Sequence, residues 1–459
     1  MTSKYKPYSK YKDSGIQWIG EIPEGWKVHR LKFLIETPVT DGPHETPEFI
    51  SEGIPFLSVD SIQGGKLVFE NCRYISEKDH IRFKKKCNPK KNDIFMGKAA
   101  SIGKIAIVNV NFEFSIWSPL ALLRPNQTSI IPKVLEYVLK SDYSQDQIDI
   151  FATSNTQKNI SMVDIPKMSL IIPPLSEQTV IANFINKKNA KIDALIEKDK
   201  KLIGLLEEKR AALINHAVTK GLPVRASRTR TGLDPNVKMK DSGIEWIGEI
   251  PENWKAMKLK HIVSRKITDG PHETPEFIDE GVPFISAEAI KKDKIDFSKK
   301  RGYITKQVHK IYCAKCKPRK DDIFLIKSGA TTGNVAIVET NDEFSIWSPL
   351  ALIRSNKEKI LPKLLYYILL TDYFKKTIEL SWSFGTQQNI GMSVIENCNI
   401  IIPSISKQNY LLNYLDKTTA KIDKTIQKIE QKINLLEECK KSLIHHTVTG
   451  KIDVRGSEI

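Results

Sequence analysis

The sequence predicts an α+β protein made of two mixed α/β domains in tandem, each followed by a long helix, with the two helices packed together. Three observations support this prediction. The chain of 459 residues repeats itself almost from end to end, and each repeat first mixes short β-branched runs with turn residues. Each repeat then ends in a long stretch with heptad-like apolar spacing. The length allows two to four domains, each with its own core.

The duplication is visible as long segments that recur nearly unchanged. They are DSGIxWIGEIPxxW at residues 13–26 and 241–254, TDGPHETPEFI at 40–50 and 268–278, and FSIWSPLAL at 114–122 and 344–352. Solenoid repeats are shorter, about 20–50 residues. Two domain-sized copies indicate pseudo-twofold symmetry within one chain, which suits a protein that grips two similar objects or two halves of one.

Each copy divides into a mixed α+β part and a helical part. The helical pattern runs from residue 176 to about 218 and from 404 to about 448, with a break expected near residues 186–189. Ser176, and Ser404 or Ser406, are candidate N-caps. The predicted segments are a first domain at 1–172, a helical region at 173–222, a basic linker at 223–240, a second domain at 241–402, a helical region at 403–449 and a tail at 450–459.

A narrow apolar seam on each predicted helix needs a partner, because most of the remaining helix surface is Lys and Glu. The nearest equivalent is the helix of the other copy, so we expect the two helices to pair; packing of each helix on its own domain is the alternative. The predicted interface residues are Ile192, Leu195 (or Ile196), Leu202 (or Ile203), Leu206, Leu213, Ile422, Ile426, Ile429, Ile433, Leu436 and Leu443.

The net charge of +17 suggests a polyanionic partner, either nucleic acid or an anionic membrane, with an inert basic surface as the alternative. No apolar run reaches the ~18 residues that span a bilayer. The first twelve residues are polar and lysine-rich, unlike a signal peptide. We therefore expect a cytoplasmic protein without a membrane partner. Six cysteines in so long a chain do not make a disulfide scaffold, which fits a reducing compartment.

No catalytic signature occurs in the sequence. The phosphate loop Gly-x-x-x-x-Gly-Lys-Ser/Thr is absent, as is the Asn/Asp-Pro-Pro-aromatic tetrapeptide of amino-methyltransferases. Glu-x-Lys, half of a nuclease site, begins only at Glu207, Glu430 and Glu438, where Glu and Lys are ordinary solvated residues of the predicted helices. Cys313 and Cys316 have metal-ligand spacing, but a structural zinc needs four ligands and only Cys316 has a cysteine counterpart in the first copy. We expect neither a metal site nor a catalytic residue.

The repeated TDGPHETPEFI segment and a basic stretch in each copy are candidate DNA-binding elements. Asp-Gly-Pro is a strong turn signal, and the turn that carries His44 or His272 either packs its side chains or faces DNA. The basic stretches either neutralise phosphates or form solvated loops. Their candidate residues are Lys84, Lys85, Lys86, Lys315, Lys317 and Arg319.

Two further pairs of segments carry candidates for base contacts. The side chains of TQKN at 156–159 and TQQN at 386–389 either pair with adenine edges or cap the next turn. A one-residue insertion separates 98–103 from 327–333, and loops that tolerate length changes often carry recognition. The candidates are Lys98, Ser101, Thr156, Gln157, Asn159, Lys327, Ser328, Thr331, Thr386, Gln387 and Asn389.

These motifs resemble those of the specificity subunits of type I restriction–modification systems. KDSGIxWIGEIPxxW resembles the start of each half of such a subunit. The Ile-Ile-Pro-x-x-Ser-x-Gln junction at 171–178 and 401–408 is similar to the beginning of the family's conserved helices, and AVTKGL at 217–222 to their end. The resemblance covers nearly the whole chain. It implies two target-recognition domains held apart by an antiparallel coiled coil, each reading one half of a bipartite double-stranded DNA target.

The resemblance also implies partners. Two modification subunits would bind the helices, carry S-adenosylmethionine and methylate adenine, and a restriction subunit using ATP and Mg would cleave; this chain would bind no cofactor. One departure is the basic stretch near residues 223–233, which is longer than the family's usual join. A free-standing two-headed DNA-binding regulator is the alternative, but it leaves the motif set unexplained. A nuclease or methyltransferase in its own right conflicts with the missing motifs.

Overall fold

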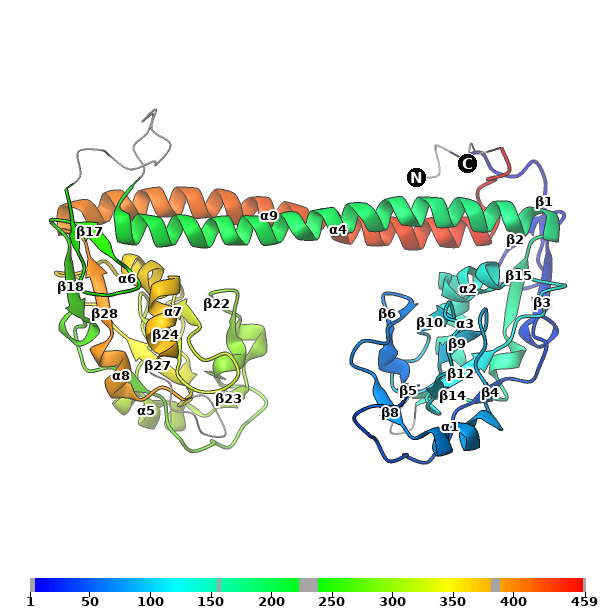
Figure 1. Cartoon of the computed structure of the whole chain (residues 1–459), viewed down its shortest axis with the longest axis horizontal. Coiled ribbons are helices and arrows are strands. Elements are labelled where there is room, and N and C mark those ends of the chain that lie inside the picture. The colour runs from blue at the N-terminus through cyan, green and yellow to red at the C-terminus, as the bar shows by residue number, and fades with distance from the viewer. Residues whose placement is uncertain (1–4, 155–157, 223–237, 381–388, 457–459) are drawn as a thin grey trace. The chain divides into compact units, whose positions relative to one another are not determined.

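The structure is a computed structural model that describes residues 5–154, 158–222, 238–380 and 389–456 (Figure 1). Its internal contacts divide the chain into two compact units. Unit 1 comprises residues 1–199 and 430–459, and unit 2 comprises residues 200–429. Each unit therefore combines one mixed domain with parts of both long helices.

The long helices are α4 (Leu175–Lys220) and α9 (Ile405–Val448). The beginning of α4 lies beside the end of α9 in unit 1, and the end of α4 lies beside the beginning of α9 in unit 2, so the pair is antiparallel (Figure 1). The expected break near residues 186–189 is wrong, because α4 is continuous. Asn186 accepts a hydrogen bond from the Tyr137 hydroxyl at 2.5 Å instead of competing for the helix backbone. Since α4 starts at Leu175, Ser176 lies within its first turn rather than at its cap.

The apolar seam follows 4-3 spacing but is displaced by one residue from part of the prediction. Leu195 and Leu202 are 43% and 42% exposed, whereas the neighbouring Ile196 is buried and Ile203 is half-buried. Of the other predicted seam residues, Ile192, Ile422, Ile429 and Leu443 are buried and Leu206, Leu213, Ile426, Ile433 and Leu436 are half-buried. The displacement arises because two adjacent apolar residues satisfy a heptad pattern equally well in sequence, and only one can face the partner helix.

In unit 1 the domain begins with the hairpin β1 (Tyr11–Asp13) and β2 (Glu21–Pro23). The next strand, β3 (Lys27–Arg30), pairs antiparallel with the last one, β15 (Ser169–Ile172). This pairing brings the start of the domain to the start of α4. The fully buried Trp26 completes the junction by donating its indole N–H to Glu177 of α4 at 3.2 Å.

The main sheet of unit 1 has the order β10 (Ile105–Ile107), β9 (Ile94–Gly97), β12 (Leu120–Leu123), β4 (Thr40–Asp41) and is antiparallel throughout. Both faces are covered. Ile94 and Met96 pack with the core that includes α2 (Pro132–Lys140) and α3 (Asp142–Phe151), and Phe95 packs on the opposite face. Burial on both faces explains why β9 and β12 read as continuous apolar runs.

A smaller sheet places β5 (Ile54–Leu57) between β11 (Ser115–Ile116), which is parallel to it, and β8 (Arg73–Ile75), which is antiparallel. Helix α1 (Glu77–Lys84) follows β8. The remaining elements are the hairpins β6 (Ile62–Gln63) with β7 (Lys66–Leu67), and β13 (Ala152–Ser154) with β14 (Lys158–Ile160).

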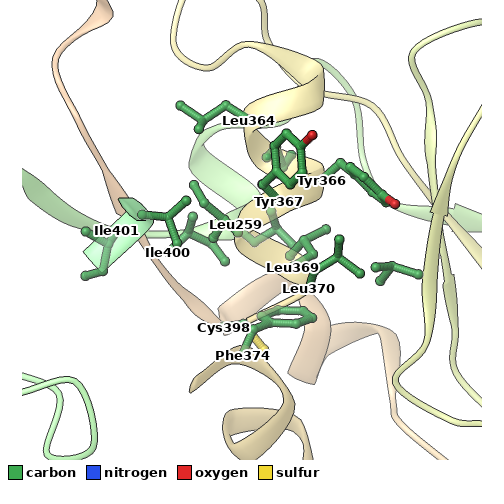
Figure 2. Packing of buried hydrophobic residues seen from close by; sticks show 14 of the residues in the cluster. Leu259, Leu364, Tyr366, Tyr367, Leu369, Leu370, Phe374, Cys398, Ile400 and Ile401 are labelled. Carbon is green, nitrogen blue, oxygen red and sulfur yellow. The ribbon is translucent and has the colours of Figure 1, made fainter. Parts of the chain in front are cut away.

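Unit 2 repeats the strand order of unit 1 in its sheets, although among the described residues the β13–β14 hairpin has no counterpart and α8 (Met392–Asn397) replaces a short 3-10 turn. Its elements are β16 (Met239–Asp241), β17 (Glu249–Pro251), β18 (Lys255–Lys258), β19 (Thr268–Asp269), β20 (Val282–Ile285), β21 (Ile290–Lys291), β22 (Lys294–Ile295), β23 (Gly302–Ile304), α5 (Lys306–Lys315), β24 (Ile323–Ile326), β25 (Val335–Ile337), β26 (Ser345–Ile346), β27 (Leu350–Ile353), α6 (Pro362–Leu369), α7 (Asp372–Glu379), α8 (Met392–Asn397) and β28 (Asn399–Ile402). Figure 2 shows part of its core, in which Leu364 and Tyr367 of α6 and Ile400 and Ile401 of β28 belong to one cluster, with Leu259 lying between Tyr367 and Ile400.

The Gln of the Ile-Ile-Pro-x-x-Ser-x-Gln motif fastens each long helix to its domain. Gln178, 1% exposed, accepts the N–H of Ile131 at 2.7 Å and donates to the carbonyls of Ser129 and Pro173. Gln408 forms the equivalent three bonds in unit 2. The motif thus has a structural role, because a buried amide needs hydrogen-bond partners and backbone groups beside the start of the helix supply them.

Candidate nucleic-acid interface

In unit 1 a buried aspartate gathers three basic side chains, which we call the Asp41 cluster (Asp41, His44, Lys86 and Lys98). The Asp41 carboxylate lies 2.5 Å from Lys86 Nζ, 3.2 Å from Lys98 Nζ and 3.1 Å from His44 Nε2. Asp41 and Lys98 are 5% and 7% exposed, while the ring of His44 faces solvent. Burial opposes ionisation, but the hydrogen bonds from both lysines lower the pKa of Asp41.

Unit 2 contains the same arrangement, which we call the Asp269 cluster (Asp269, His272, Lys315 and Lys327). The distances from the Asp269 carboxylate are 2.7 Å to Lys315, 3.3 Å to Lys327 and 3.2 Å to His272. The two lysines again outweigh burial and lower the pKa of Asp269. Two copies therefore keep the same four residues and nearly the same contacts.

The clusters hold together loops that are far apart in the sequence. The TDGPHETPEFI turn of unit 1 lies against the SIWSPL loop, because Ser118 donates its N–H to the Pro43 carbonyl at 3.2 Å. A Cβ at Gly42 would lie only 1.8 Å from the Ile116 carbonyl oxygen, so glycine is required for this close approach. Gly270 and Ile346 repeat the contact at 2.0 Å.

The loop at residues 98–103 and the segment that contains Asn159 meet at the buried Lys98. Lys98 donates its N–H to the Pro119 carbonyl at 2.8 Å and accepts the N–H of Ile160 at 2.9 Å, which places Asn159 beside Ala99. In unit 2 Lys327 makes the same two bonds, and Asn389 lies beside Ser328. The structure thus brings together four segments in each unit. They are the repeated turn, the SIWSPL loop, the segment containing Asn159 or Asn389, and a loop that differs in length between the units (98–103 and 327–333), which we call the loop of variable length.

The remaining predicted basic residues have different surroundings. Lys84 forms an ion pair with Glu113, and Lys317 lies 3.6 Å from Glu343. Lys85 and Arg319 are exposed. Lys98 and Lys327 differ from the other predicted lysines because they are themselves buried, each beside the carboxylate of its cluster.

Candidates for base contacts lie on the loops next to the clusters. Ser101 is half-buried, and Thr331 is exposed in the longer loop of unit 2. Asn159 and Asn389 are exposed. The predicted residues Thr156, Gln157, Thr386 and Gln387 lie outside the described residues.

Sequence reasoning missed the aspartates and a pair of stacked arginines. Arg73 lies 4.5 Å above the Phe49 ring and 6.0 Å from Trp117, and its counterpart Arg301 lies 4.2 Å above Trp347. Both arginines therefore stack beside the SIWSPL loop. Asp41 and Asp269 were detectable, since each belongs to the identical repeated segment.

Within the described ranges, no group of three or more His, Cys, Asp or Glu side chains is arranged to hold a metal ion. Burial raises the pKa of the Cys313 and Cys316 thiols. Cys313 Sγ lies 3.4 Å from Nε2 of His309, whose other ring nitrogen lies 2.8 Å from the Ser345 hydroxyl. Each helix among the described residues is too short or too polar to span a bilayer.

Comparison with known proteins identifies the family. The family described as type I restriction modification DNA specificity domain matches residues 23–204 and 251–435. The chain is 27% identical over 453 residues to the putative type I restriction enzyme MjaX specificity subunit of Methanocaldococcus jannaschii, covering 95% of this chain and 96% of that protein. It is 24% identical over 448 residues to the type I restriction enzyme MjaVIII specificity subunit of the same organism, covering 95% and 94%.

A solved structure shares the fold. It belongs to work described as the structural basis of complex assembly and conformational transition of the type I R-M system. It covers 94% of this chain and 99% of its own with a TM-score of 0.57 and 16% identity. The resemblance seen in the sequence motifs is confirmed: the chain belongs to the family of type I restriction–modification DNA specificity subunits.

Proposed function

We propose that this chain reads a bipartite double-stranded DNA target for a type I restriction–modification complex, with one half-site for each mixed domain. The observation that carries the proposal is the pair of clusters, Asp41 in unit 1 and Asp269 in unit 2, built from the same residues at the meeting point of the same four segments. The net charge of +17 supports a polyanionic ligand.

The surroundings of the clusters suggest how contacts are divided. Exposed basic groups such as Lys85 and His44 suit phosphate contacts, which position a duplex without reading it. Hydroxyl and amide side chains such as Thr331 and Asn389 suit base edges. In this arrangement the buried lysines fix the loops, and the loops carry the sequence preference.

Catalysis in this proposal belongs to partner subunits. Modification subunits would bind the helices, hold S-adenosylmethionine and methylate adenine, and a restriction subunit would hold ATP and Mg and cleave. The solved relative described with assembly of the type I R-M system supports partner binding. This chain contributes the choice of site and no reacting group.

Co-expression with modification subunits tests the proposal. The assembled complex should methylate adenines in a two-part motif, mapped by methylation-aware sequencing, and the purified chain alone should incorporate no labelled methyl group. Methyl transfer by the chain alone would contradict it. A chain that binds DNA but never co-purifies with modification subunits would support the alternative of a free-standing regulator.

A further inference from the structure

The turn between β21 and β22 in unit 2 has a strained backbone. Lys292 and Asp293 adopt φ values of 47° and 62°, a left-handed conformation that disfavours residues other than glycine. In unit 1 the equivalent turn between β6 and β7 contains Gly64 and Gly65, with φ values of 55° and 73°, and needs no compensation. The turn of unit 2 therefore carries residues that suit its backbone conformation less well than the two glycines of unit 1 do.

Arg210 of α4 supplies the compensating contacts. Its guanidinium, 19% exposed, lies 3.3 Å from the Asp293 carboxylate and 3.0 Å from that of Asp423 in α9. The hydroxyl of Tyr366 in α6 donates to the Asp293 carbonyl at 2.9 Å. Burial opposes the charge of Arg210, but the two aspartates outweigh it and raise the pKa of the guanidinium. One side chain thus ties both long helices to the turn.

The turn between β21 and β22 is followed by β22, which packs against the strand that comes after the loop of variable length in unit 2. Both β22 and α6 contact β25, which begins at Val335, two residues after the end of the 327–333 loop. Asp293 precedes β22, and Tyr366 lies within α6. Arg210 therefore acts on the two elements that pack against the base of this loop.

In unit 1 the equivalent turn is bound by a residue of its own domain. Lys140 of α2 donates to the Gly65 carbonyl at 2.9 Å and pairs with the buried Glu136 at 2.5 Å. Lys440 of α9, the counterpart of Arg210, pairs with Asp193 of α4 at 2.5 Å. Asp193 in turn lies 3.9 Å from the exposed Lys66, so Lys440 reaches the turn only through a weak, solvated pair.

We propose that Arg210, although it belongs to the first copy of the repeat, is a positioning residue for the recognition loop of the second domain. The inference rests on the proposed function that each mixed domain reads one half-site. Arg210 should therefore affect recognition of the second half-site alone. Its position in the first repeat would instead suggest an effect on the first half-site.

The test uses the complete chain assembled with its modification subunits. Methylation rates are measured on the mapped target and on duplexes with one mismatch in either half-site. The half-site weakened by Asp269→Asn is taken as that of the second domain. Arg210→Gln should lower the cognate-to-mismatch ratio there about 10-fold and leave the other half-site unchanged. Arg210→Lys keeps the positive charge but not the several N–H donors of the guanidinium, so it should lower this ratio less than Arg210→Gln does.

Two further variants separate positioning from general stability. Lys440→Gln removes the counterpart ion pair and should change neither ratio. Asp293→Gly removes the ion pair but restores the residue type that suits a positive φ, so it should fold and weaken the same half-site as Arg210→Gln. The inference would be overturned if Arg210→Gln lowered the cognate-to-mismatch ratio equally at both half-sites or at neither. It would also be overturned if Lys440→Gln had the same effect as Arg210→Gln. Absence of sequence-specific methylation by the unaltered complex would instead contradict the proposed function.

Discussion

The two units agree at the clusters and differ at the loops beside them. Asp41 and Asp269 each bind two lysines and a histidine within 3.3 Å. At the ends of the adjoining loops, a Cβ on Gly103 would meet the Gln145 side chain at 2.4 Å, while one on Gly333 would meet no described atom within 4 Å. The two units therefore share the framework around the clusters and differ in the length and packing of the adjoining loops. Under the proposed function, these loops would account for any difference between the two half-sites.

The largest effect is expected from substitutions in the Asp41 and Asp269 clusters, which the two units share. Asp41→Asn leaves Lys98 buried without its anion and should destabilise unit 1 by about 3 kcal/mol, with loss of recognition at one half-site. Asp269→Asn should do the same at the other half-site. Urea unfolding and methylation of half-site mismatches measure the two effects. If both variants weakened the same half-site, the assignment of one cluster to each half-site would fail.

Exchange of the loop of variable length between the units should change the recognised sequence rather than the free energy of unfolding. We expect replacement of residues 98–103 by the sequence of 327–333 to alter the methylated motif in one half-site only, towards the other. Each good base contact discriminates by ~1–3 kcal/mol, so a few changes suffice. The check is the motif mapped by sequencing. An unaltered motif from an active complex would show that these loops do not read bases.

Acidification should weaken both clusters alike. The pKa values of Asp41 and Asp269 lie below their ordinary value of 3.8 in the folded chain. The clusters therefore contribute their full stability above that pH and lose it as the pH falls through the folded pKa. The difference in free energy of unfolding between the wild type and Asp41→Asn should be constant above pH ~4 and shrink below it. A difference that shrinks with rising pH would contradict this.

The smallest effect is expected at an exposed lysine. Lys85→Ala should weaken DNA binding equally for cognate and mismatched sites and reduce the salt dependence of binding by about one phosphate contact. Binding titrations at several salt concentrations measure this. Any change in the preferred sequence would show that Lys85 reaches a base rather than a phosphate.

The extent of successful prediction differs along the chain. Heptad spacing predicted both long helices, because an apolar seam is a local, periodic feature. It named Leu195 and Leu202 for the seam with Ile196 and Ile203 as alternatives, and the structure buries Ile196 and half-buries Ile203. The spacing could not choose between neighbours, since the side that faces a partner depends on the partner. The segments of the candidate interface were also found from the sequence, because duplication marks them twice.

The sequence by itself determined the duplication, the two mixed domains, the paired helices and the family, all of which rest on repeated motifs or local periodicity. Only the tertiary structure decided that Asp41 joins Lys86 and Lys98, and that Arg210 of the first copy contacts Asp293 of the second. The physical reason is that ion pairs between buried groups depend on which loops and helices the fold brings within a few ångströms. Linear order carries no signal for that proximity.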